Sequence, residues 1–262
     1  MTTHQRVALA SLSAAMDGGF ISIADVSRAM SNVGAAHDHR LIGGVAVMLH
    51  IQRLGLDLPL RATGDADFGV APYLLKEPAL VTTIEALGYK KVAGNRWERL
   101  IDDRRVAAVD LLIPAYTSRP RQTKRVGNVV TTEVPGLAVA LRRPGIAIDA
   151  ELHLTSGEVH ETTIMLPDAL ATLVLKARVR TVRDEERDAQ DLWRCLEIAA
   201  ADGVTPELVD AEGGAGLRDL LHRELGPGGA SLSAATRGLQ DDAGARLRTR
   251  IRSLLADAIG TA

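Results

Sequence analysis

The strongest constraint on the fold is a change of hydrophobic period at Pro167. Before this residue, short apolar or alternating runs that are typical of strands are mixed with helical segments. Two of these runs, 146–154 and 158–166, flank a tight-turn sequence that ends at Gly157. After Pro167, apolar residues recur at the helical period. The pattern predicts an α+β fold: a mixed sheet flanked by helices over 1–166, followed by a helical C-terminal domain over 167–262.

A glycine pair marks the first candidate for ligand binding. Gly43 and Gly44 follow the short apolar run Leu41-Ile42 and precede a helical run, 45–54. A strand, a glycine turn and a helix in this order expose backbone N–H groups at the helix N-terminus, where phosphate oxygens bind well. An ordinary tight turn is the alternative.

Aspartates on two predicted strands supply the second candidate. Asp65 and Asp67 alternate with apolar residues, so both carboxylates project from one face of a strand. Such a pair repels itself unless a cation lies between its members, and Mg²⁺ prefers carboxylate oxygens together with substrate phosphates. Asp110 lies in the apolar run 106–113 and is the preferred third carboxylate, ahead of Asp149. An aspartate that caps a turn or pairs with an arginine is the alternative for Asp110.

The composition narrows the range of functions. A formal net charge of −2, from 31 Lys and Arg against 33 Asp and Glu, argues against a protein that wraps nucleic acid over its whole surface. The single cysteine, Cys195, excludes an intramolecular disulfide and favours a reducing compartment. No apolar run reaches the roughly 18 residues of a membrane-spanning helix, and the N-terminal segment lacks the apolar core of a signal peptide. We therefore expect a cytoplasmic protein with no membrane association.

The helical part adds a lysine whose surroundings require a partner. Lys176 lies in the apolar run 170–177, where an unpaired ammonium group is costly. A phosphate or a carboxylate would relieve that cost, and a lysine that reaches solvent from the helix edge is the alternative.

Together these segments resemble the nucleotidyltransferases of the DNA-polymerase-β superfamily, and most closely the AbiEii-like toxins, which include the MenT-type toxins. The resemblance covers about residues 38–195. It rests on the segments 41–44 (LIGG), 61–67 (RATGDAD), 109–110 (VD), 175–178 (LKAR) and 187–192 (RDAQDL). It departs from the superfamily in a long spacing between Gly44 and Asp65, and in Gly44 itself, which stands where a Ser is common.

The resemblance implies a polymerase-β-like nucleotidyltransferase core that uses an NTP and, in all, two Mg²⁺ ions. Asp65, Asp67 and Asp110 would hold the metal, and Gly43 and Gly44 would lie against the triphosphate. From the helical domain, Lys176 and Asp191 would join the active site, with Asp191 orienting Lys176. Additional triphosphate contacts are expected from Arg178 and Arg180.

The implied activity is that of a toxin that transfers NMP to the 3′ end of tRNA and blocks translation, with a cognate antitoxin protein as its partner. The segment 114–135, which follows the run that contains Asp110, is predicted to be a polar, basic loop. It contains Arg119, Arg121, Lys124 and Arg125, which could contact RNA, and a solvated loop is the alternative. The same core also serves enzymes that inactivate antibiotics by nucleotidyl transfer, and a non-catalytic nucleotide-binding module is a third possibility. Thr63 matches a region in which some of these toxins are silenced by phosphorylation; a plain strand residue is the alternative.

Overall fold

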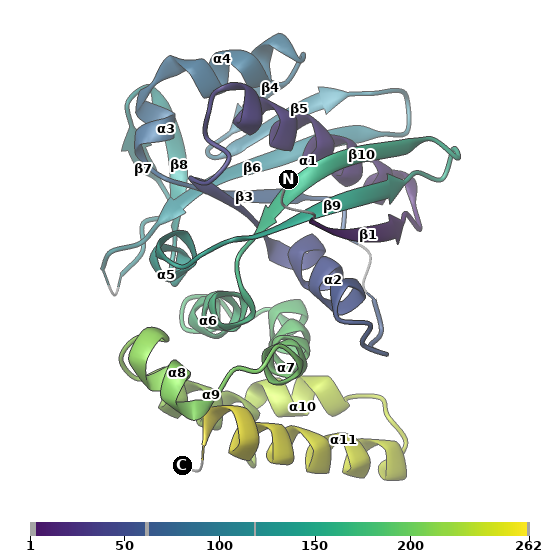
Figure 1. The fold of residues 1–262 in the computed structure, drawn as a ribbon, viewed down its shortest axis with the longest axis vertical. Coiled ribbons are helices and arrows are strands. Elements are labelled where there is room, and N and C mark those ends of the chain that lie inside the picture. Colours follow the sequence, from purple (N-terminus) through teal and green to yellow (C-terminus); the bar gives the residue numbers. More distant parts are fainter. Residues whose placement is uncertain (1–3, 61–62, 118, 261–262) are drawn as a thin grey trace. The chain divides into compact units, whose positions relative to one another are not determined.

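The computed structural model describes residues 4–60, 63–117 and 119–260, which form two compact units, 1–168 and 169–262 (Figure 1). The first unit combines helices with two sheets and the second is helical, so the predicted α+β class is confirmed. Within the described ranges, every helix is too short or too polar to cross a membrane.

The first unit contains all the strands of the described chain. They are β1 (Gln5–Ala10), β2 (His39–Ile42), β3 (Ala66–Val70), β4 (Lys90–Ala93), β5 (Arg96–Leu100), β6 (Val106–Pro114), β7 (Lys124–Val126), β8 (Val129–Val134), β9 (Ile146–His153) and β10 (Val159–Leu166). Its helices are α1 (Ala14–Asn32), α2 (Gly43–Arg53), α3 (Tyr73–Lys76), α4 (Pro78–Ala86) and α5 (Leu137–Arg142).

The larger sheet carries the predicted functional strands. Its order is β2-β3-β6-β5-β4, with β8 beside the C-terminal half of β6 and β7 beside β8. Strands β3 and β6 are parallel, whereas β2 and β5 run antiparallel to them. The smaller sheet has the order β1-β9-β10, and its β9–β10 hairpin closes at Gly157 as the sequence predicts.

One face of the larger sheet forms the hydrophobic core of the first unit. Phe68 and Val109 point into this core, and α1 packs across β6 and β10 (Figure 1). Helix α1 begins with Ser13, whose side chain accepts a hydrogen bond from the Met16 amide. Gly18 lets the helix approach the sheet, because a Cβ there would overlap the carbonyl group of Val106. Because side chains alternate along a strand, residues next to the core residues project from the opposite face.

The segment 114–135, which we expected to be a basic loop, contains a hairpin instead. Strands β7 and β8 pair through Val126 and Val129, so Gly127 and Asn128 alone form the turn. Gly127 has a φ of +56°, a conformation that favours glycine. The β-branched residues that flank Gly-Asn are typical of a hairpin. The prolines of the preceding segment favour a loop, and for this reason the hairpin was not predicted.

The second unit consists of helices. They are α6 (Ala169–Val179), α7 (Glu186–Ala201), α8 (Pro206–Glu212), α9 (Leu217–Leu225), α10 (Ala230–Thr236) and α11 (Asp241–Leu254), followed by a π-helical turn, Leu255–Ile259. The apolar stretch of α6 is buried against α7, and the buried Leu173 and Leu196 belong to this core. Lys176 is one of the few charged residues that this core encloses.

Candidate active site

The register of the larger sheet places two of the predicted carboxylates side by side. Asp67 of β3 is paired with Asp110 of the parallel strand β6, and Ile42 of β2 lies on the other side of Asp67. Residues paired in register project from the same face, about 4.8 Å apart from strand to strand. Both carboxylates therefore lie on the face opposite the core, and both are only partly buried.

Gly43 brings the start of α2 against Asp67. It follows Ile42 directly and has a φ of +77°, in the left-handed region that glycine tolerates. A Cβ at this position would overlap Oδ2 of Asp67 and lie 3.0 Å from its Cγ. The Asp67 carboxylate is thus held next to the N-terminus of an 11-residue helix that has no side-chain cap, where the helix dipole favours negative charge. Gly44 occupies the next position of the same helix.

Arg96 contacts Asp65 and Asp110 and so links Asp65 to the other two predicted carboxylates. Its guanidinium Nη1 lies 3.0 Å from Asp65 Oδ1 and 3.3 Å from Asp110 Oδ2, while its Nε donates to Glu98 Oε1 at 2.7 Å. Burial lowers the pKa of Arg96, but the surrounding carboxylates Glu98, Asp65 and Asp110 outweigh burial and raise it. We refer to Asp65, Asp67 and Asp110 as the carboxylate set.

Asp110 is held from two sides. Asn95 Nδ2 donates to Asp110 Oδ1 at 2.7 Å, and Thr132 Oγ1 donates to Asn95 Oδ1 at 2.9 Å. Burial raises the pKa of Asp110, the Arg96 guanidinium opposes the rise, and the charge of Asp65 adds to it. The second oxygen of Asp110 faces Arg96.

The sequence analysis missed Asn95, Arg96 and Glu98. A signal for them exists in the sequence, because two runs typical of strands, 95–101 and 105–113, flank a short polar turn centred on residue 103. Antiparallel pairing about this centre places Arg96 opposite Asp110, which is the register observed. The rival carboxylate Asp149 lies in the smaller sheet, where it accepts a hydrogen bond from Thr163 at 2.8 Å.

The side chains of the carboxylate set are not gathered closely enough to coordinate one metal ion together. Among the described residues, no three His, Cys, Asp or Glu side chains are gathered so that they could hold a metal ion. The chemistry of the donors nevertheless suits a hard divalent cation, because Asp67 and Asp110 share one face and Asp65 contacts the same arginine nitrogen as Asp110. A cation already lies between two of them, the guanidinium of Arg96. A guanidinium is larger than a metal ion and holds its carboxylates further apart.

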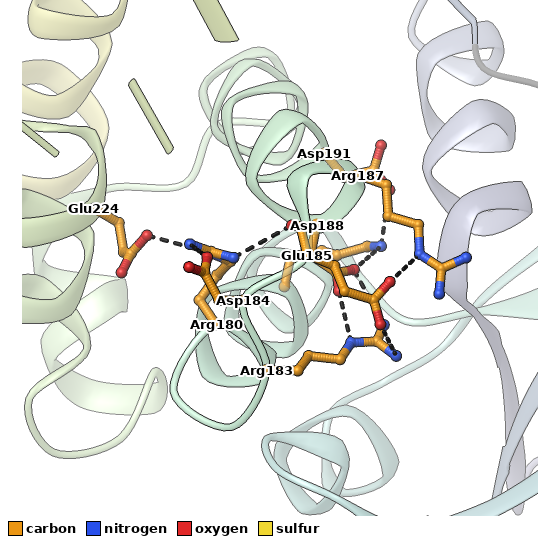
Figure 2. A network of polar contacts seen from close by, with 9 residues as sticks. Arg180, Arg183, Asp184, Glu185, Arg187, Asp188, Asp191 and Glu224 are labelled. Carbon is orange, nitrogen blue, oxygen red and sulfur yellow. Dashed lines mark hydrogen bonds and ion pairs between the residues drawn. The ribbon is translucent and has the colours of Figure 1, made fainter. Parts of the chain in front are cut away.

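The lysine predicted for the active site belongs to the second unit and is paired there. Lys176 Nζ lies 2.9 Å from Asp191 Oδ2 and 3.4 Å from Asp188 Oδ1, and only 10% of its side chain is exposed. Figure 2 shows the two aspartates on α7 within a wider polar network. Burial lowers the pKa of Lys176, but Asp191 and Asp188 raise it above its usual value. The expected contact of Asp191 with Lys176 is present, and the triphosphate role of Lys176 stays a prediction.

The two arginines near Lys176 also have partners within the second unit. Arg178 donates to the Ala215 carbonyl at 2.5 Å. Arg180 is buried and forms ion pairs with Asp184 at 2.6 Å and Glu224 at 3.2 Å (Figure 2). A triphosphate contact by Arg180 would have to compete with these carboxylates.

The basic segment lies in the first unit and is largely exposed. Lys124 is 3.7 Å from Glu133 Oε1, and the Arg121 amide donates to Glu133 Oε2 at 2.9 Å. Arg119 and Arg125 are exposed, as an RNA-binding surface requires. Their predicted contact with RNA stays a prediction.

Thr63 is the first described residue after a gap in the description: Arg61 and Ala62 of the motif 61–67 lie outside the described residues. Thr63 is half-buried and lies before β3 rather than within it.

Comparisons with known proteins add no assignment, because no family model and no curated protein matches the chain.

Proposed function

We propose that this protein is a metal-dependent nucleotidyltransferase that transfers NMP from an NTP to a hydroxyl group. The observation that carries the proposal is that Asp67 and Asp110 lie side by side on neighbouring strands, with Gly43 at the start of α2 against Asp67. An anion-binding helix N-terminus beside a face rich in carboxylates suits a substrate that is a polyphosphate bound with a divalent cation.

The roles of the residues follow from their positions. The amides at the start of α2 would bind phosphate oxygens, so the triphosphate lies at the β2 edge of the carboxylate set. Asp65, Asp67 and Asp110 would hold Mg²⁺, which supplies charge neutralisation at the phosphates and activation of the acceptor hydroxyl. Asp110 lies on β6, one strand further from β2 than Asp67, and would therefore face the acceptor, in an orientation fixed by Asn95.

In the transfer, the acceptor oxygen forms a bond to the α-phosphorus and gives up its proton to solvent water. The bond between the α-phosphorus and the bridging oxygen breaks, and pyrophosphate leaves. In-line transfer of this kind depends on alignment and on charge stabilisation, which a rigid sheet face provides. The predicted contributions of Lys176 and Asp191 would be additional to this arrangement.

An RNA acceptor is the form of the proposal that we favour. Arg119 and Arg125 supply exposed positive charge in the unit that carries the carboxylate set, whereas a small acceptor does not need such a surface. With the family resemblance, this supports a toxin that modifies the 3′ end of tRNA and is restrained by an antitoxin.

The test is transfer of label from each of the four α-labelled NTPs to total RNA in the presence of Mg²⁺. We expect a labelled RNA band in the tRNA size range, lost in Asp67→Asn. The matched control is Asp149→Asn, which removes an equivalent charge from the smaller sheet and should retain transfer. Absence of label with all four nucleotides would contradict an RNA acceptor.

The remaining alternatives have their own outcomes. Labelling of an antibiotic but not of RNA, together with drug resistance and no growth arrest on induction, would identify a small-molecule enzyme. Binding of Mg²⁺-nucleotide by calorimetry without any transfer would identify a non-catalytic module.

A further inference from the structure

Arg96 occupies the place at which the carboxylate set would receive a cation. It extends from β5, and it contacts Asp65 and Asp110 through one nitrogen, at 3.0 and 3.3 Å. Asp65, Asp110 and Glu98 thus surround a single guanidinium group. An arginine cannot release its charge by deprotonation at any ordinary pH, so this positive charge is permanent.

The same arginine has a second anchor outside the carboxylate set. Glu98 lies two residues along β5, hence on the same face, and accepts a hydrogen bond from Arg96 Nε at 2.7 Å. This bond uses a different nitrogen from the one that faces Asp65 and Asp110. Arg96 can therefore give up the two aspartates and keep an ion pair.

We propose that Arg96 is a displaceable counter-ion, a positioning residue that holds the carboxylate set in the metal-free protein and competes with the divalent cation for Asp65 and Asp110. This inference rests on the proposed function. In the metal-free protein, Arg96 lies between Asp65 and Asp110 and occupies the position that the ion would take. When the cation binds, Arg96 releases both aspartates and stays on Glu98.

The competition predicts an unusual sign for a substitution at this site. Removal of a residue that merely supports the fold weakens metal binding, because the ligands lose their positions. Removal of a competing cation strengthens it, because the metal no longer has to displace a charge-assisted hydrogen bond. Metal affinity in the absence of nucleotide therefore distinguishes the two roles.

The experiment titrates full-length protein with Mn²⁺ and follows the free ion by electron paramagnetic resonance. We expect Arg96→Gln to bind Mn²⁺ about tenfold more tightly than the wild type. Arg96→Lys, which keeps the charge but loses the planar fork, should fall between the two. As a second readout, saturating Mn²⁺ should raise the melting temperature more in Arg96→Gln than in the wild type.

The matched control is Arg99→Gln. Arg99 lies on the same strand and pairs with Asp25 at 2.6 Å, away from the carboxylate set. The Arg99→Gln substitution should lower the melting temperature and leave the Mn²⁺ affinity unchanged. Equal or weaker Mn²⁺ binding by both folded Arg96 variants would overturn the inference and leave the proposed function standing.

Two further outcomes separate the inference from the function. Absence of Mn²⁺ binding in every variant and in the wild type would overturn both. If Arg96→Gln binds Mn²⁺ more tightly than the wild type and the wild type transfers no nucleotide, the result would support the inference and contradict the proposed function.

Discussion

Substitution of Gly43 by alanine tests whether α2 and Asp67 form one functional unit. The φ of +77° at Gly43 costs an alanine about 1–2 kcal/mol. For a unit of this size, each kcal/mol lowers the melting temperature by about 2–4 °C. The new Cβ would also overlap Oδ2 of Asp67, so the carboxylate has to turn away from the helix N-terminus. A displacement of about 1 Å at a reacting centre lowers the rate about 10²-fold.

The control for this prediction is Gly55→Ala, just beyond the other end of α2. Gly55 has a φ of +62°, but a Cβ there would meet no atom within 4 Å. Gly55→Ala should show the backbone cost alone, with a lower melting temperature and normal transfer of label to RNA. Gly43→Ala should show a similar or larger loss of melting temperature and lose about 99% of the transfer activity. If the two variants transfer label equally well, Asp67 does not act at the reacting centre.

Three other substitutions examine the buried charges and the basic surface. Lys176→Met should destabilise the second unit by about 3 kcal/mol in denaturant unfolding, since the buried Asp188 and Asp191 lose the ammonium group that they share. The same change at the partly exposed Lys124 should cost less than about 1 kcal/mol. Burial lowers the pKa of His50 from 6.5 to about 3. Above pH 6.5 His50 is neutral in both states and the free energy of unfolding is unaffected; below pH 6.5 the free energy of unfolding falls, because only the unfolded chain takes up a proton at His50. His50→Gln, which can still donate to the Pro167 carbonyl, should flatten the decline of melting temperature between pH 6.5 and 4.5, and an unchanged slope would contradict this cause. Paired substitution of Arg119 and Arg125 by Gln should weaken RNA binding and reduce its salt dependence by about two ions; an unchanged salt slope would exclude this segment from the RNA interface.

The position of Asp67 within a strand could be predicted from the alternation of polar and apolar residues, whereas Asp65, predicted on the same strand, lies just before β3. Their neighbourhood with Asp110 required one further step, the pairing of β3 with β6, and the family resemblance supplied it. Arg96 was harder to find, because its position depends on the register of the β5–β6 hairpin. That register follows from the turn at 101–105, where Asp102 accepts hydrogen bonds from the amides of Arg104 and Arg105.

The surroundings of Lys176 could be predicted from the sequence only in part. Its burial was predictable from the apolar run around it, and a carboxylate was one of two expected partners. The structure supplies two carboxylates, because Asp188 and Asp191 are three residues apart on α7 and therefore lie on the same side of that helix. The spacing of these aspartates was visible in the sequence, but the packing of α6 on α7 that aims both at one ammonium group was not.

The two groups of charges differ in a way that bears on function. In the second unit, Lys176, Arg183 and Arg194 pair with Asp188 and Asp191, and all of these side chains except the exposed Arg183 are buried, as expected of charges that stabilise a core. In the first unit, two carboxylates on adjacent strands repel each other by about 3 kcal/mol at a spacing near 5 Å in a partly buried setting. Arg96 lies against Asp65 and Asp110, and Asp67 lies against the start of α2. An excess of negative charge on a partly exposed face gains little for the fold. The binding chemistry of this protein should therefore be sought first at Asp65, Asp67 and Asp110.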